Sequence, residues 1–222
     1  MIQSFENIHD VCVIVAHPDD ETLWAGGMIL MHPEWDCKVF TLCRASDPDR
    51  APKFYRALLW LGVTGEMADF DDGAEQIPLS ESEVQQAILN YMDNNHFDLI
   101  LSHGLWGEYT RHRRHEEVSK AVLTLWFNSN INANKIWLFA YTDGNKTHLP
   151  LPETNAHYKV ALPPSILKDK QNIITDIYGF TPDSWEAQTT PREEAFWMFD
   201  SQTEAKKWFK EKMPDNESLS SL

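Results

Sequence analysis

The amino-acid sequence predicts an α/β protein, a single-domain Rossmann-like three-layer sandwich with a mostly parallel sheet. Two observations predict this class. Apolar runs that end at turn residues alternate with segments of helical period, the pattern of parallel strands joined by crossover helices. No internal repeat and no long polar linker divides the chain. We therefore expect one domain over residues 1–213, followed by a flexible tail at 214–222.

The first half of the chain alternates regularly between the two kinds of element. The predicted strands are Val11–Ala16, Cys37–Cys43, Met67–Phe70 and Asp98–Ser102. The predicted helices are Asp20–His32, Lys53–Leu61, Ser80–Met92 and Glu116–Phe127. Gly62 is typical of a helix C-terminus, and Ser80 with Glu83 three residues later forms the pattern of a capping box.

The pattern weakens in the second half of the chain. We expect a strand at Lys135–Tyr141 and an edge strand at His157–Leu162. Helices are expected at Ser165–Ile177 and Glu193–Lys212. The segment Tyr178–Glu186 reads as an ordered loop, which could line the acceptor pocket or pack against a partner subunit, and packing is favoured.

Composition and charge exclude several classes of protein. A net charge of −15 argues against nucleic acid as a partner, because it repels phosphate across the whole surface. No apolar run approaches the roughly 20 residues that cross a bilayer. The first ten residues carry acids and no basic cluster, unlike a signal peptide, so a cytoplasmic protein with buried free cysteines is expected. The sequence leaves a homo-oligomer open.

Ionisable side chains follow the first predicted strand directly, in the run VCVIVAHPDDE. In open α/β sheets, ligands bind just beyond the carboxyl ends of the strands, so chemistry is expected here. His17 and Asp20 offer an imidazole and a carboxylate, which are normal zinc ligands. Asp19 is then free to accept a proton from water. The alternative, an aspartate that caps the next helix, accounts for one carboxylate and leaves His17 unexplained.

A second group of candidate residues follows the predicted strand Asp98–Ser102, in the segment HGLWGEYTRHRRH. His112 and His115 lie three residues apart and share one face of a starting helix. One can complete a zinc site, and the other can steady an oxyanion or protonate a leaving amine. The competing interpretation is a charged helix start whose arginines face water. Both motifs follow strands, which favours one shared site if the two strands are neighbours.

These two motifs together resemble the signatures of the zinc N-deacetylase family called PIG-L or LmbE-like. The resemblance runs from about Val11 to Ala121. The matched positions are Ala16–Glu21, Ala25–Gly27, Arg50, Leu61–Gly62, Gly107–Tyr109, His112 and His115. The run AHPDDE is present without change, and it is the most specific part of the match. The resemblance implies removal of an N-acetyl group from an amino sugar.

The resemblance also implies a role for each matched side chain. One zinc ion per chain would be held by His17, Asp20 and His115, with Fe²⁺ as the other candidate metal. Asp19 would be the general base and His112 its electrophilic or acid partner. The residues expected to contact substrate are Arg50 and Tyr109 from the matched positions, and Trp106, whose ring could stack on a sugar.

The chain departs from the family pattern around the second motif. Two residues separate Tyr109 from His112 where the family has one. Arg114 stands where the family commonly has an aspartate, so Glu116 or Glu117 would have to pair with His112. These changes surround the substrate more than the metal, and they indicate an unusual substrate.

The function expected from these residues is zinc-dependent hydrolysis of the N-acetyl group of a GlcNAc-type conjugate, which releases acetate and a free amine. The substrate would be a small molecule or a glycoconjugate. Two alternatives stay open at this point: a metal-dependent hydrolase of another amide or ester, and a non-catalytic sugar-binding homologue.

Overall fold

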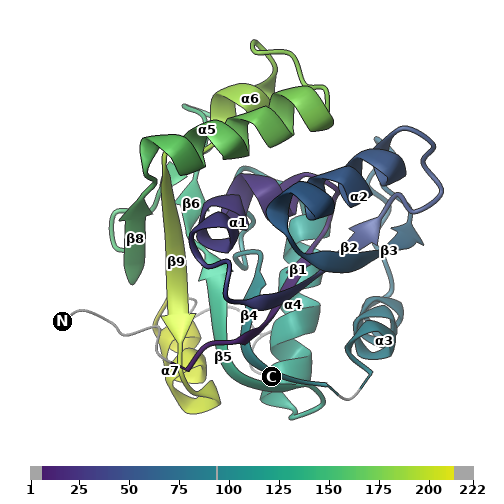
Figure 1. The fold of residues 1–222 in the computed structure, drawn as a ribbon. Helices are drawn as coiled ribbons and strands as arrows, with labels where there is room; N and C mark the ends of the chain where they lie inside the picture. The colour runs from purple at the N-terminus through teal and green to yellow at the C-terminus, as the bar shows by residue number, and fades with distance from the viewer. Residues whose placement is uncertain (1–6, 94, 213–222) are drawn as a thin grey trace.

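The computed structural model describes residues 7–93 and 95–212 (Figure 1). Its centre is a seven-stranded sheet in the order β3-β2-β1-β4-β5-β9-β8. The strands are β1 (Asp10–Val15), β2 (Asp36–Cys43), β3 (Thr64–Phe70), β4 (His96–Ser102), β5 (Asn132–Phe139), β8 (Tyr158–Ala161) and β9 (Glu193–Phe199). The first five run parallel, and β9 is antiparallel to both β5 and β8. The sheet is therefore mostly parallel, as the sequence predicts.

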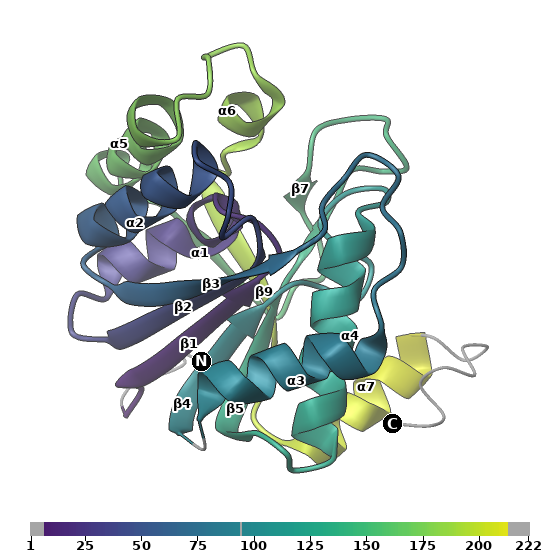
Figure 2. The same ribbon diagram turned by 90° about the vertical axis from the view of Figure 1, so that its right-hand side faces the viewer.

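Helices cover both faces of this sheet. On one face lie α1 (Asp20–Met31), α2 (Arg50–Leu61) and α5 (Pro164–Asn172), and on the other α3 (Glu81–Met92), α4 (Arg113–Phe127) and α7 (Gln202–Lys212) (Figure 2). Shorter elements complete the fold: β6 (Tyr141–Thr142), β7 (Leu151–Pro152), the π-helix η1 (Ile173–Ile177) and α6 (Trp185–Thr189). The three layers confirm the predicted fold class.

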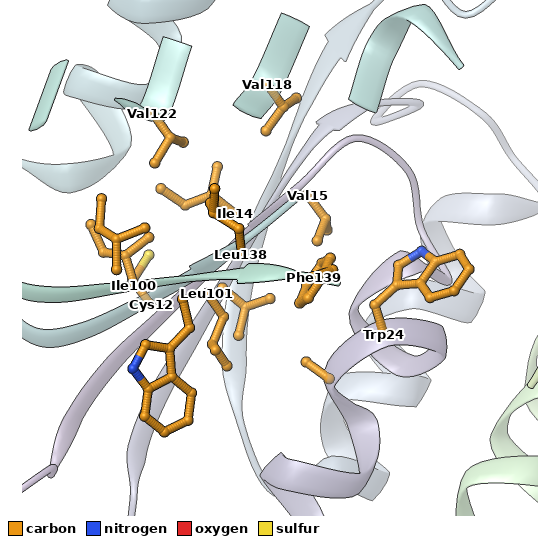
Figure 3. Packing of buried hydrophobic residues seen from close by; sticks show 14 of the residues in the cluster. Cys12, Ile14, Val15, Trp24, Ile100, Leu101, Val118, Val122, Leu138 and Phe139 are labelled. Carbon is orange, nitrogen blue, oxygen red and sulfur yellow. The ribbon is translucent and has the colours of Figure 1, made fainter. Parts of the chain in front are cut away.

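Apolar side chains fill the space between the layers (Figure 3). Val118 and Val122 of α4 pack on one face of the strands, and Trp24 of α1 lies on the opposite face. All three side chains are fully buried, as are Val11–Val15 of β1 and Leu99–Ser102 of β4, which lie between them. Burial on both faces explains why these strands appear in the sequence as unbroken apolar runs.

The order of the strands decides where ligands can bind. From β1 the chain moves outward to β2 and β3, and it then returns to the other side of β1 to form β4 and β5. Val11 pairs with Cys37 of β2 on one side and with Leu99 of β4 on the other. β1 and β4 are thus neighbours at the point where the order reverses, which is the usual binding position in such sheets.

The expected helix over Glu193–Lys212 is wrong in its first part. Glu193–Phe199 forms the strand β9, and only Gln202–Lys212 is helical. The run EEAFWMF is rich in aromatic side chains and is buried from its second residue onward, which suits a strand covered on both faces. The amphipathic period of the following helix masks this boundary in the sequence.

A buried ion pair joins β9 to the helical layer. The Lys170 ammonium lies 2.5 Å from a carboxylate oxygen of Glu194, and both side chains are fully buried. The same carboxylate accepts the backbone N–H groups of Gly27 and Met28 in α1. A Cβ atom at Gly27 would lie 2.4 Å from Leu162, so only glycine allows this approach.

Most of the remaining expectations agree with the structure. Gly62 takes the left-handed conformation after α2, and the three cysteines are buried and free. Ser80 precedes α3 as expected, but its hydroxyl contacts Ser82 and makes no capping bond to the backbone. The predicted tail at 214–222 lies outside the described residues. Within the described ranges, no helix combines the length and the apolar character needed to cross a membrane.

Candidate functional site

The carboxyl ends of β1 and β4 bring the two sequence motifs together in one cavity. Its volume is about 400 Å³. The cavity is lined by His17, Pro18, Asp19, Asp20, Leu23, Arg44, Arg50, Asp72, Tyr109, His112, Trp185 and Glu186. His115 lies directly behind this lining, in contact with His17 and Asp20. The two strands are neighbours, as a shared site for the two motifs requires.

Three buried donor atoms form a triangle at the base of the cavity. His17 Nδ1 lies 3.0 Å from Asp20 Oδ2, and His115 Nε2 lies 3.3 Å from the same oxygen. The two imidazole nitrogens are 3.2 Å apart. Tetrahedral zinc with ligands at roughly 2.0–2.1 Å separates its donors by roughly 3.3 Å. The donor set and its spacing therefore fit a zinc ion held by these three residues.

Carboxylates behind both imidazoles orient them toward this point. His17 Nε2 lies 3.1 Å from Asp72 Oδ1, and His115 Nδ1 lies 2.5 Å from Glu108 Oε2. When each of these nitrogens carries the proton, the other nitrogen of each ring presents its lone pair to a metal. Trp24 fixes Asp20 in the same way, because its indole N–H donates to Oδ1 and leaves Oδ2 facing the imidazoles.

The supporting carboxylates are themselves held in the charged form. Arg44 donates two hydrogen bonds to Asp72, at 2.9 and 2.6 Å. Burial opposes the charge, but His17 and Arg44 together hold the pKa of Asp72 well below its usual range. Glu108 is fully buried, and against that burial the imidazoles of His103 and His115 lower its pKa to about 2.

His103 is a buried histidine that sequence analysis does not assign. Its Nε2 accepts the backbone N–H of Ala16 at 2.9 Å, and its Nδ1 lies 2.9 Å from Glu108. Its ring stacks on His115 at 3.8 Å between centroids. His103 forms a group with Asp20 and His115 that is close enough to hold a metal ion, and its Nε2 lies 3.5 Å from Asp20. Because that Nε2 already accepts the backbone N–H of Ala16, we assign His103 a supporting role.

Asp19 lies beside the donor triangle in an unusual backbone conformation. Its φ angle is +117°, and its N–H donates to Glu21 Oε2 at 2.9 Å. Arg50 contacts the carboxylate at 3.3 Å. Burial, together with the charge of Asp20, raises the pKa of Asp19 well above its usual value. A carboxylate with a raised proton affinity at the rim of the triangle suits acid–base chemistry.

His112 stands over the triangle, with its ring centroid 4.5 Å from those of His17 and His115. Its Nδ1 is buried and has no hydrogen-bond partner among the described residues. Burial and the two neighbouring imidazoles lower its pKa to about 3, so the ring is neutral. The carboxylate partner expected from Glu116 or Glu117 is absent, because these residues bind Arg111 and Arg114.

Arg114 is not the solvent-facing arginine that a charged helix start would present. Its side chain is fully buried. The guanidinium donates to the backbone carbonyls of Asp71 and Ile77, at 2.7 and 2.9 Å, and to Glu117 at 2.6 Å. Arg114 therefore fixes the loop that carries Asp72 to the start of α4.

The aromatic lining differs from the one expected. Trp106 lies outside this cavity and packs 6.1 Å from Trp208 in a different one. Trp185 lines the cavity above the donor triangle instead, and its ring meets that of Tyr109 edge-on at 4.6 Å. For the segment that carries Trp185, packing was the favoured expectation and lining of the pocket was the alternative. Arg50 and Tyr109 both line the cavity where the sequence places them.

Arg44 and Asp72, which the sequence analysis missed, could have been found from their positions after strands. Arg44 follows β2 directly, and Asp72 lies two residues beyond β3. The carboxyl ends of all parallel strands meet at one edge of the sheet, so polar residues after β2 and β3 were candidates on the same grounds as those after β1 and β4.

Comparisons with known proteins bear on the fold. No model of a protein family matches the sequence. A protein of Acanthamoeba polyphaga mimivirus, described as uncharacterized protein L374, is 23% identical over 148 residues. That match covers 60% of this chain and 62% of the relative, so it spans less than two thirds of the relative's length.

Several solved structures share the fold. N,N'-diacetylchitobiose deacetylase from Pyrococcus horikoshii has a TM-score of 0.68 at 16% identity, over 88% of this chain and 85% of that one. A deacetylase triple mutant from the teicoplanin biosynthetic pathway reaches 0.64 at 16% identity, over 86% and 98%. GalB, the 4-carboxy-2-hydroxymuconate hydratase from Pseudomonas putida, reaches 0.60 at 15% identity, over 86% and 96%. Because a hydratase shares this fold, the reaction has to be argued from the site.

Proposed function

We propose that the chain is a metal-dependent N-deacetylase of the PIG-L or LmbE-like type, which hydrolyses the N-acetyl group of an amino-sugar conjugate. The observation that carries this proposal is the buried triangle of His17, Asp20 and His115, with the carboxylate of Asp19 at its rim. Metal ligands and an acid–base group in one open cavity are the parts that amide hydrolysis by water requires.

Two further observations support this choice of reaction. The signature AHPDDE begins at the end of β1, next to β4 and the second motif, in a fold that sugar deacetylases also have. The three proposed metal ligands and the proposed acid–base residue Asp19 all lie among the described residues. The hydratase with this fold shows that the fold alone would not select deacetylation.

We propose zinc as the metal, with Fe²⁺ as the other candidate because two imidazoles and one carboxylate suit both ions. When bound, zinc would act as a Lewis acid that polarises the amide carbonyl and makes water more acidic. His17 and His115 would reach the metal as neutral imidazoles, since Asp72 and Glu108 accept their other N–H groups.

The side chains of the chain itself would move the protons. Asp19 accepts a proton from the attacking water and returns it to the departing nitrogen, so that acetate and a free amine leave. His112, as a neutral ring, can donate one N–H to the oxygen of the tetrahedral intermediate. Its Nδ1 has no partner among the described residues, which supports a role for the ring as a hydrogen-bond donor to substrate.

The remaining lining would hold the sugar. Arg50 and Glu186 supply charged groups at the cavity walls, and Trp185 with Tyr109 supplies an aromatic wall. Trp185 is 36% exposed, which leaves part of its ring free to contact a substrate. These residues suit a ring with hydroxyl groups on one side and apolar C–H groups on the other.

The test is amine release from a panel of N-acetylated amino sugars and their conjugates, with esters and other amides as comparison substrates. We expect the parent chain to release acetate and amine in equal amounts. Asp19→Asn, which keeps the shape of the side chain, should lower the rate by about 10²–10⁴-fold while the metal stays bound. Faster hydrolysis of an ester or of another amide would move the function to that class.

A further inference from the structure

A second cavity, of about 260 Å³, lies outside the catalytic site. It is lined by Trp106, Glu153, Asn155, Trp197, Trp208 and Lys212. These residues come from the loop after β4, the turn after β7, strand β9 and helix α7. None of them lines the catalytic cavity. Three of the nine tryptophans of the chain therefore converge on a place that the proposed reaction does not use.

The three indole rings form the apolar part of this cavity. Trp208 lies 4.9 Å from Trp197 and 6.1 Å from Trp106, with the ring planes tilted by 48° and 54°. Trp197 is 6% exposed, whereas Trp106 is 45% exposed. At these angles the rings do not stack flat on one another, so the exposed Trp106 and the partly buried Trp208 can present part of a face to a ligand. A large aromatic side chain left this exposed beside two others marks a binding surface.

Charged and polar side chains line the cavity beside the rings. Neither the carboxylate of Glu153 nor the ammonium of Lys212 forms an ion pair among the described residues. Asn155 accepts a hydrogen bond from Thr154 through Oδ1, which leaves its amide N–H groups to donate. The cavity thus combines an acceptor, two kinds of donor and aromatic faces.

We propose that this cavity is a carbohydrate-binding site that takes a neutral pyranose ring. A sugar ring has an apolar C–H face that packs on indole and a rim of hydroxyl groups that bind carboxylate, amide and ammonium. The site carries one charge of each sign, so it has no net charge that would select an anionic or a cationic ligand. The volume lies below the roughly 300–1,000 Å³ of pockets for drug-sized ligands, which suits one ring.

The turn that carries Trp106 connects this cavity to the residues behind the catalytic site. Trp106 lies in the turn between Gly104 and Glu108, and the Glu108 carboxylate accepts the Gly104 N–H at 3.0 Å as well as supporting His115. A longer glycan could be held here by a ring that is not the reacting one. Binding itself does not depend on the deacetylase activity, so the two proposals can fail separately.

The test is isothermal titration calorimetry of the full chain with short oligomers of glucose and of N-acetylglucosamine. The parent chain should bind a neutral oligomer, and Trp106→Ala should weaken this binding about tenfold. Trp208→Phe keeps an aromatic ring and should weaken it less. Trp60→Ala is the matched control, because Trp60 is 51% exposed on α2, away from the cavity. It should bind like the parent.

A further variant separates this site from the catalytic cavity. Trp185→Ala alters the aromatic wall of the catalytic cavity, and binding at the second site should persist in it. The proposal is overturned if no neutral oligomer binds the parent, or if Trp185→Ala abolishes binding while Trp106→Ala leaves it unchanged. It is also overturned if Trp106→Ala alters the oligomeric state without altering sugar affinity, since a second copy of the chain would then cover the cavity.

Discussion

The hydroxyl of Tyr178 donates a 2.7 Å hydrogen bond to Glu21, and both side chains are buried. The other oxygen of Glu21 accepts the N–H of Asp19, whose φ angle is positive. A second residue of the same segment, Phe180, lies 4.5 Å from the guanidinium of Arg50, which contacts the Asp19 carboxylate. The segment after η1 thus supports Asp19 from two sides.

Tyr178→Phe should therefore lower both stability and turnover. A lost hydrogen bond to a charged group costs about 1.5–3 kcal/mol, measurable as the free energy of unfolding in denaturant. We expect kcat to fall while KM and metal content stay unchanged, because only the placement of Asp19 is disturbed. Tyr91→Phe is the control, since the buried Tyr91 hydroxyl has no partner among the described residues. Equal losses in both variants would argue against the positioning role.

Asp72→Asn should weaken metal binding about 10–100-fold, as loss of a group behind a metal ligand typically does. The pKa of Asp72 is lowered in the folded protein, so its negative charge supports His17 at any pH above about 4. Because this pKa is lowered, the difference in metal affinity between variant and parent should not come from titration of Asp72 until the pH falls well below that value. Competition with a zinc-binding dye measures the zinc affinity of both proteins. Asp71→Asn, at an exposed neighbour, should leave affinity near the parent value.

Arg114→Ala should destabilise the fold by about 3 kcal/mol, because it removes a fully buried guanidinium and leaves two carbonyl groups and one oxygen of Glu117 without their donor. Arg111→Ala removes an exposed pair with Glu116 and should cost less than about 1 kcal/mol. Thermal and denaturant unfolding of the two variants would compare them. Similar small losses in both would place Arg114 in solvent, against the structure.

Gly26→Ala and Gly27→Ala should change stability in opposite directions. A Cβ at Gly26 meets ordinary contacts at 3.5 Å or more, so alanine should stabilise α1 by roughly 0.5–1 kcal/mol. A Cβ at Gly27 would overlap Leu162 and Glu194, which should cost about 1–3 kcal/mol. Unfolding free energies measure both. A stabilising Gly27→Ala would show that β9 and α1 do not pack this closely.

The sequence predicts most of the sheet and the meeting of the candidate metal ligands, because both depend on local signals. Buried parallel strands are unbroken apolar runs, and His17 and Asp20 follow one of them directly. β9 was missed because, unlike the first five strands, it is antiparallel to its neighbour β5 and far from it in the sequence. A helix also follows it directly. Its pairing with β5 is a long-range property that no local window contains.

The supporting residues were harder to predict for a related reason. Glu108 reads as an ordinary polar residue in a loop, yet it is buried between two imidazoles. Arg114 reads as surface charge, and only the path of the loop after β3 makes it internal. Trp106 lies in a loop and Trp185 begins the short helix α6, and their assignment to different cavities depends on how these segments fold back.

The most direct test of the metal-dependent deacetylase is a joint measurement of bound zinc and released acetate. The parent chain, stripped of metal and reloaded, should bind zinc and release acetate from an N-acetylated amino sugar. His115→Ala should lose both, and Asp19→Asn should keep zinc and lose acetate release. A folded parent chain that binds no zinc when it is supplied, or acetate release that survives in Asp19→Asn, would contradict the account.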